Sequence, residues 1–199
     1  DIYEMIEVIG EFYYKKPEET LAIANAVIGK KPSDSVLLHD FGGHKIYGKT
    51  HKDLVMKCLE LLSNIRYFKS DEALRLLAAL SLNTDKDIAN KALDITKRFA
   101  KYDYNYMTQA KNYAPQRKSL DFVLTWPRED QLQHIEFVEV VLKELLSPSI
   151  EGTTSGLNEE AQYTITMHSG VVSPTDFLKK MRREAIDLTH ELYKASEDP

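Results

Sequence analysis

The sequence is short of cysteine and of long apolar segments, and each absence excludes a class of protein. Cys58 is the single cysteine among 199 residues, so no disulfide can form within the chain, which fits a reducing compartment. No apolar run approaches the roughly 18 residues that a membrane span needs. The first residues also lack the charged-then-apolar order of a signal peptide. We therefore expect a cytoplasmic protein without a membrane partner.

Motifs that mark common enzyme classes are missing as well. The sequence contains no Gly-x-Ser-x-Gly, no His-Glu-x-x-His and no paired cysteines. We therefore expect no enzymatic activity, no cofactor and no bound metal ion.

What remains is the composition of an ordinary folded protein. Apolar residues make up 43% of the chain and charged residues 29%, which suits a packed core. The formal net charge of −5 argues against a dedicated DNA binder, because such surfaces are usually basic. An apolar stripe with helical spacing already begins at Ile2. We expect residues 1–199 to form a single helical-repeat domain, as a fragment of a longer multidomain protein.

Helical periodicity dominates the chain. Apolar residues recur at helical spacing in seven stretches, at 2–9, 21–28, 54–62, 74–82, 88–99, 132–145 and 177–192. Helix starts are predicted at Pro17, Thr50, Thr84, Pro127 and Ser173, where Pro or a capping residue precedes the stripe. Residues 30–49 are predicted to be irregular.

Two of the predicted helices look like copies of each other. The segments THKDLVMKCL from Thr50 and TDKDIANKAL from Thr84 share Thr, Lys, Asp, Lys and Leu at the same places, 34 residues apart. In each, the Thr is followed three positions later by an acid, Asp53 or Asp87, as in a capping box. We therefore predict that both threonines cap parallel helices that lie one repeat apart, with another helix between them from about Ser70.

Residues 50–100 resemble HEAT and armadillo-like repeats, since the Trp, Gly and Tyr pattern of tetratricopeptide repeats is missing. The resemblance implies an all-α fold, a right-handed α–α superhelix (a solenoid) of antiparallel helix pairs. Near residues 161–172, Tyr163, Ile165 and Met167 alternate with polar residues and are followed by Ser169-Gly170. This pattern predicts a small β-hairpin, with its turn at Ser169-Gly170, inserted between helices.

One segment matches the phosphate-binding loop expression. The sequence GHKIYGKT runs from Gly43 to Thr50 before a predicted helix, and it would place Gly43, Gly48, Lys49 and Thr50 around phosphates and Mg²⁺. The sequence lacks the alternating strands and helices that such a site needs, and Ile46 and Tyr47 are bulky. A capped helix after a glycine-rich loop is the preferred interpretation.

Histidines cluster in the same region. His39, His44 and His51 lie close together in the sequence, but their spacing matches no helical pair of metal ligands. Cys58 occupies the place of Ala92 in the other copy, a small core position. We interpret the histidines as surface loop residues.

Basic residues and tyrosines alternate between positions 97 and 118. Cations for phosphates and rings for base stacking are the chemistry of single-strand binding. The residues that would contact nucleic acid are Lys97, Arg98, Lys101, Tyr104, Lys111, Arg117 and Lys118. The alternative is that the rings pack between helices beneath solvated cations. In the last helix, spacings such as Lys180 to Glu184 predict a solvated face with exposed ion pairs.

Taken together, these patterns predict a protein-interaction or scaffolding segment of a larger cytoplasmic protein. Its partner would be another protein or a neighbouring domain of the same chain. Nucleic-acid binding through residues 97–118 is the first alternative, and nucleotide binding at Gly43–Thr50 is the second.

Overall fold

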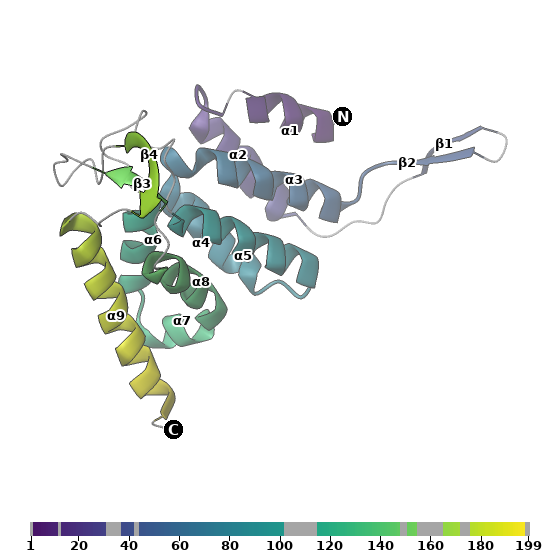
Figure 1. Cartoon of the computed structure of the whole chain (residues 1–199). Helices are drawn as coiled ribbons and strands as arrows, with labels where there is room; N and C mark the ends of the chain where they lie inside the picture. Colours follow the sequence, from purple (N-terminus) through teal and green to yellow (C-terminus); the bar gives the residue numbers. More distant parts are fainter. Residues whose placement is uncertain are drawn as a thin grey trace. The chain divides into compact units, whose positions relative to one another are not determined.

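The computed structural model in Figure 1 describes most of the chain. The described residues are 2–11, 13–30, 37–41, 44–101, 115–147, 151–154, 165–171 and 176–197. They are mainly α-helical, as predicted. The chain divides into two compact units, Asp1–Ile95 and Thr96–Pro199, and the boundary falls within one helix. That residues 1–199 form a single domain stays a prediction.

The first unit consists of helices and one short pair of strands. Its elements are α1 (Ile2–Glu11), α2 (Pro17–Ile28), β1 (Leu37–Phe41), β2 (His44–Tyr47), α3 (His51–Asn64), the 3₁₀ helix η1 (Ile65–Tyr67), α4 (Ser70–Ser81) and α5 (Lys86–Ala100), whose last residues belong to the second unit. Helix α2 begins at Pro17 as predicted and is closed by Gly29, whose N–H donates to Asn25 O.

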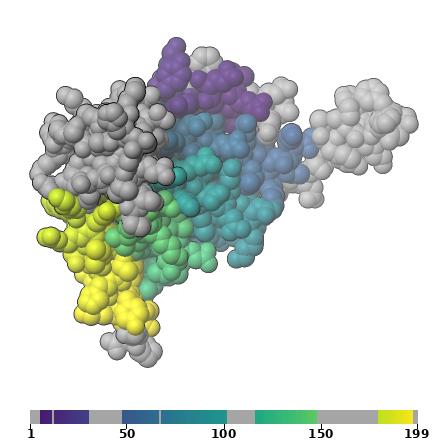
Figure 2. Space-filling model, in the orientation of Figure 1, coloured from purple at the N-terminus to yellow at the C-terminus, as the bar shows by residue number. Residues whose placement is uncertain are grey.

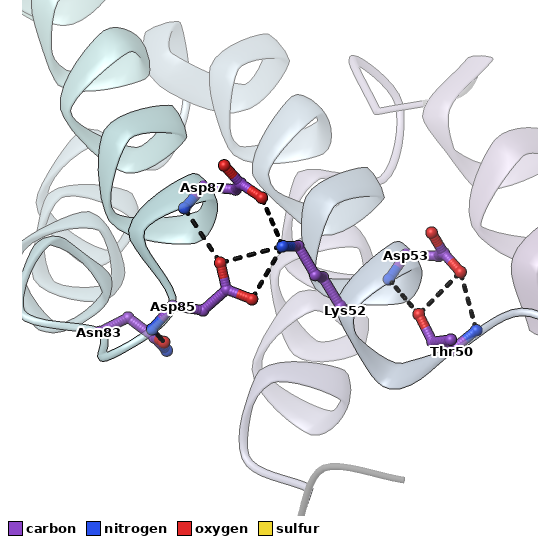
Figure 3. Close-up of polar contacts among 6 residues, drawn as sticks. All are labelled: Thr50, Lys52, Asp53, Asn83, Asp85 and Asp87. Atoms are coloured by element: carbon purple, nitrogen blue, oxygen red, sulfur yellow. Dashed lines mark hydrogen bonds and ion pairs between the residues drawn. The ribbon is translucent and has the colours of Figure 1, made fainter. Parts of the chain in front are cut away.

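Helix α3 begins with the predicted capping box at Thr50. The Thr50 hydroxyl accepts a hydrogen bond from the Asp53 N–H at 3.1 Å. In return the Thr50 N–H donates to Asp53 Oδ2 at 2.8 Å (Figure 3). Two backbone N–H groups at the helix start are thereby satisfied. The prediction for Thr50 is confirmed.

Helix α5 begins later than predicted, so the prediction that Thr84 is its cap is wrong. The capping residue is Asp85, whose Oδ1 accepts from the Asp87 N–H and whose carbonyl accepts from the Ala89 N–H, both at 3.0 Å. Asn83 Oδ1 accepts in turn from the Asp85 N–H at 2.8 Å. Asp is at least as good a cap as Thr, and the Asn83 side chain shapes the turn that precedes it.

Polar contacts at the helix ends define the directions in which the helices run. His51 Nε2, at the start of α3, lies 3.0 Å from Val27 O, at the end of α2, so α2 and α3 are antiparallel. Lys69 precedes α4 and lies 3.0 Å from Glu18 in the first turn of α2, which places the starts of α2 and α4 together. Figure 1 shows α2 to α5 as neighbouring helices that alternate in direction.

Helix α1 packs on α3 through a small residue. A Cβ atom at Gly10 would lie only 2.8 Å from Leu61 Cδ2, so glycine permits the close approach of the two helices. Ile6 is fully buried. An ion pair of 3.2 Å between Lys57 and Glu7 adds a polar contact beside them.

Residues 37–47, predicted to be irregular, contain an antiparallel strand pair instead. β1 and β2 are paired with each other in the register Leu37↔Tyr47, His39↔Ile46, Asp40↔Lys45 and Phe41↔His44. The sequence between the strands is Gly42-Gly43, a dipeptide that favours two-residue hairpin loops. Gly43 is also the first residue of the phosphate-loop match, so the same glycine fits two different patterns.

The second unit contains α6 (Pro115–Leu124), α7 (Arg128–Gln133), α8 (Ile135–Leu146), β3 (Glu151–Thr154), β4 (Ile165–Val171) and α9 (Asp176–Glu197). The single long helix predicted from Pro127 is broken at His134, which has φ −103° and ψ 34°. The break removes Leu132 and Ile135 from the buried stripe, and both remain exposed. Helix α6 was not predicted.

The predicted hairpin near residues 161–172 is not confirmed in the form expected. Ser169 and Gly170 lie inside β4 rather than in a turn. The partner of β4 is β3, and Thr154 is paired with Ile165. Glycine is unfavourable inside a strand and often marks a bulge, and the pairing of β4 with β3 is irregular between Thr166 and Val171, where this Ser-Gly pair lies.

The core of the second unit forms where α6, α8 and α9 meet. Its buried apolar residues include Leu120, Val123, Phe137, Val138, Val141, Leu145, Met181, Ala185 and Leu188. Beside it, Trp126 contacts Phe122, Phe137 and His134, with ring centroids 4.9, 5.6 and 5.1 Å away. The aromatic cluster closes the side of the core next to the break at His134.

The charged face of α9 does more than contact solvent. Arg182 donates to Leu145 O at 3.2 Å and to Ser147 O at 2.5 Å, so it satisfies carbonyls at the end of α8. Glu184 pairs with Arg117 of α6 at 2.6 Å. The expectation of a purely solvated face is therefore wrong, because two of its charged residues connect α9 to other helices.

The two threonines of the copied segments provide a direct test of the helix starts. Thr50→Ala should lower the free energy of unfolding by about 1 kcal/mol, because the α3 capping box loses its acceptor. Thr84→Ala, the matched control, should change it by less than about 0.5 kcal/mol, because Thr84 is exposed and precedes the cap. Urea unfolding followed by circular dichroism measures both. Equal losses would contradict the assignment of Asp85 as the cap.

Candidate functional site

The strongest candidate site lies between α3 and α5, and a lysine connects the starts of these helices. Lys52 Nζ in the first turn of α3 lies 2.9 Å from Asp85 Oδ2 and 2.5 Å from Asp87 Oδ2 (Figure 3). Further along, Lys91 of α5 lies 3.9 Å from Glu60 of α3. The start of α3 contacts the start of α5, and the middle of α3 contacts the middle of α5. The two helices therefore lie side by side and run in the same direction.

A groove of about 600 Å³ separates the exposed edges of the two helices. Its lining consists of Lys52, Asp53 and Met56 from α3 and Asp87, Asn90, Lys91 and Asp94 from α5. Figure 2 shows both helices on the same face of the first unit, in blue and teal. The groove therefore combines one apolar side chain with polar groups from parallel helices.

The groove carries negative charge that ion pairs within the described part of the chain do not neutralise. Hydrogen bonds from Lys52 to Asp87 and Asp85 raise the pKa of the Lys52 ammonium group and hold the pKa of Asp85 below its usual value. Lys91 is close to Glu60. Both cations are thus beside carboxylates, whereas Asp94 is exposed and makes no ion pair with another described residue.

The Gly43–Thr50 match contains a strand and a capped helix start. His44–Tyr47 form β2, and Gly43 lies outside the described residues. Gly48 is half-buried and Lys49 is exposed. The Thr50 hydroxyl, which a phosphate site would use for Mg²⁺, donates to Asp53 Oδ2 at 2.7 Å. Phosphate binding here stays a prediction.

The basic segment is only partly described, because Tyr104 and Lys111 lie within residues 102–114, outside the described residues. Arg117 is half-buried, 2.6 Å from Glu184 Oε2, and it also donates to Asp121. Desolvation lowers the pKa of Arg117, but its hydrogen bonds to Asp121 and Glu184 raise it overall.

The other cations of the segment differ in their surroundings. Lys97 lies 3.4 Å from Glu144 Oε1. Lys118 is half-buried, whereas Arg98 and Lys101 are exposed. Carboxylates of this chain therefore already neutralise two of the predicted phosphate contacts, Lys97 and Arg117.

Cys58 and His51 belong to the fold rather than to a site. Cys58 is fully buried, and desolvation raises the pKa of its thiol to about 12. Ala92 is equally buried, as the comparison of the two copies predicts. His51 contacts Val27 O at the start of α3 instead of lying in a loop. Among the residues that the structure describes, no group of three or more His, Cys, Asp or Glu side chains could hold a metal ion.

The groove was not among the sites predicted from the sequence. The comparison of the two copies did align Lys52, Asp53 and Asp87 with equivalent positions. It gave no sign of ion pairs between the copies, because these depend on how the helices are rotated about their axes. Asn90 and Asp94 are not among the residues that the two copies share, so this comparison did not select them.

Comparisons with known proteins add no family to these observations. No protein-family model, no curated protein and no solved structure matches the chain. Within the described part of the chain, none of the helices has the length and apolar character required to cross a membrane.

The ion pairs of Lys52 predict a measurable pH dependence. Because the folded-state pKa of Asp85 is lowered, its stabilisation is present above the unfolded-state pKa and is lost as pH falls through the folded value. Lys52→Met should raise the pKa of the Asp85 carboxyl, measured by NMR titration. Lys97→Met, the matched control in the second unit, should leave it unchanged. An identical Asp85 titration in Lys52→Met would contradict the pairing.

The burial of Cys58 predicts an inert thiol. The native protein should react with a disulfide reagent such as DTNB only as fast as it unfolds, because the reactive thiolate is absent at neutral pH. The rate should therefore rise steeply with urea, in parallel with the unfolding rate. Rapid reaction in native buffer would contradict the burial of Cys58.

Proposed function

We propose that this chain is a protein-interaction or scaffolding segment, built from helical repeats of the α-solenoid type, in a larger cytoplasmic protein. Two antiparallel pairs, α2 with α3 and α4 with α5, support the repeat. Equivalent helices start together, as the contacts of Lys69 with Glu18 and of Lys52 with Asp85 indicate. Stacked pairs of this kind create extended surfaces for partners.

The inserted hairpin explains why the repeat is irregular in the sequence. The connection between α2 and α3 covers residues 29–50 and includes β1 and β2, whereas that between α4 and α5 covers only residues 82–85. Without residues 37–47, the first connection would be closer in length to the second, although still longer. The right-handed superhelix remains part of this proposal, and the single buried cysteine is consistent with a cytoplasmic location.

The groove between α3 and α5 is the observation that carries the interaction function. Its two lysines, Lys52 and Lys91, already lie beside carboxylates of the chain. The negative charge that remains available to a ligand is therefore that of Asp94. An extended segment with Lys or Arg side chains, from a protein partner or a neighbouring domain, complements this charge. Met56 offers an apolar contact between the polar walls.

The two alternatives have less support. Nucleic-acid binding would need cations that are available for phosphates, but Arg117 and Lys97 lie beside carboxylates of the chain itself. Nucleotide binding would need the Thr50 hydroxyl, which already contacts Asp53. Protein interaction through the groove is therefore the function that the geometry favours.

Site-specific photo-cross-linking tests this function. A photoreactive residue in place of Asn90 should cross-link a partner in cells, whereas the same residue in place of exposed Arg75 on α4 should not. The purified partner should then bind the chain, with Kd measured by calorimetry. Asp94→Lys should weaken binding about tenfold or more, since it reverses the sign of the unmatched charge.

Glu136→Lys is the matched control, because Glu136 is exposed in α8 and the change in net charge is the same. It should leave the Kd unchanged. Equal loss of affinity in both variants would mean that only the net charge of the chain matters. Equal cross-linking from Asn90 and Arg75 would contradict a binding site in the groove.

A further inference from the structure

Helix α9 buries one face and exposes the opposite one. Its buried side chains recur at intervals of four, three and four residues, and they are Met181, Ala185, Leu188 and Leu192. They contribute to the core that α9 shares with α6 and α8, and Figure 1 shows α6, α7 and α8 on one side of α9. The other side of the helix is therefore open to a further partner.

The exposed face of α9 carries its own regular pattern. Arg183, Ile186, His190 and Tyr193 follow one another at intervals of three, four and three residues, and all four are exposed. Ile186 and Tyr193 have exposed fractions of 56% and 60%, which is high for large apolar side chains. Alternating intervals of three and four residues define the line along which two helices pack in a coiled coil. We call these four residues the outer seam.

Two carboxylates of α9 are already used inside the second unit. Glu184 lies 2.6 Å from Arg117 of α6, and Glu191 accepts a hydrogen bond from Arg128 of α7. Both acids therefore interact with the neighbouring helices of the unit. They do not neutralise the cations on the open side of α9.

The open side of α9 is positively charged. Lys180, Arg183 and Lys194 are exposed, and none of them makes an ion pair with another residue that the structure describes. Among the described carboxylates of α9, Asp187 alone lacks such a pair. Three cations therefore stand against one acid beside two exposed apolar side chains.

This combination of charge and spacing defines a partner. We propose that the outer seam docks an acidic amphipathic helix of another protein. Ile186 and Tyr193 are two turns apart, about 10.5 Å along the axis, so apolar residues of the partner at the same spacing can pack against both. A carboxylate of the partner can then pair with Arg183 between charge-assisted hydrogen bonds, and this polar contact fixes the register.

Other occupants fit the outer seam less well. A helix that lies in a membrane surface needs an apolar face along much of its length, and the open side of α9 offers only two large apolar residues among those described. A second copy of α9 would bring the same cations against the seam, and like charges repel. The outer seam belongs to the second unit and takes a partner of the opposite charge to the groove between α3 and α5, so either proposal can fail without the other.

Fluorescence anisotropy with a designed peptide and the full chain tests the outer seam. The peptide spans about three heptads, with Leu at one seam position, Glu at the other, and Ala and Gln elsewhere. A scrambled peptide of the same composition is its control, and the ordered peptide should bind about tenfold or more tightly, because both have the same charge but only one has the register.

Substitutions in the chain locate the binding. Ile186→Asp and Arg183→Glu should each weaken binding of the ordered peptide about tenfold or more. Val8→Asp and Arg75→Glu are the matched controls, because both residues are exposed in the first unit. They should leave the affinity unchanged. Asp94→Lys, in the groove, should not weaken it either, which separates this result from the test of the groove.

A charge exchange distinguishes a lost contact from a damaged fold. A peptide with Lys in place of Glu should bind the Arg183→Glu chain more tightly than the unsubstituted chain, a reversal that unfolding cannot produce. Equal binding of the ordered and scrambled peptides, or the absence of this reversal, would overturn the proposal. So would tighter Arg183-dependent binding to phosphatidylserine vesicles or single-stranded RNA than to the peptide. Dimerisation of the chain that Ile186→Asp abolishes, measured by analytical ultracentrifugation, would assign the seam to a second copy instead.

Discussion

The first unit depends on the burial of helix α3 on several sides. Val55, Cys58, Leu59, Leu61 and Leu62 are all buried, and their positions cover nearly half of the helix circumference. A helix that buries one stripe needs one neighbour, but α3 needs several. Burying one such side chain contributes about 1.5–3 kcal/mol, so each neighbouring helix removes a substantial exposed area. α1 and α2 both pack against α3 for this reason.

Burial alone does not determine how the neighbouring helices are ordered, because the hydrophobic effect has no direction. The directional contacts lie at the helix ends, where backbone groups lack partners within the helix. His51 reaches the last turn of α2, Lys69 reaches the first turn of α2, and Lys52 connects α3 to the cap of α5. Each contact is at least partly open to solvent and individually weak, yet together they are compatible with only one set of helix directions.

The predictions from the sequence succeeded where the signal was local. Helix α4 was expected from about Ser70, and it begins there. The capping box at Thr50 depends on four consecutive residues, so its pattern was sufficient. The start of α5 failed because Asn83 and Asp85 compete with Thr84 for the same backbone groups. Such competition between good caps is decided by the geometry of the turn, which a pattern does not contain.

The strands and the groove depend on contacts between distant residues. The sequence around His134 has a continuous helical pattern, so no local signal predicts the break. The break separates α7 from α8, and it depends on how each of these helices packs. The strand β4 found its partner in β3 instead of in the residues that follow Ser169-Gly170. The groove needs α3 and α5 to have a particular rotation, to which the whole first unit contributes. None of this information is present in the spacing of residues along the chain.

Trp126 has a consequence for spectroscopy. It is the single tryptophan of the sequence, and its ring partners Phe122, His134 and Phe137 all belong to the second unit. Intrinsic tryptophan emission therefore reports the environment of that unit alone, while helical ellipticity reports both. Because α5 crosses the boundary between the units, the two signals together test whether the units unfold as one cooperative structure, which a shared midpoint would indicate.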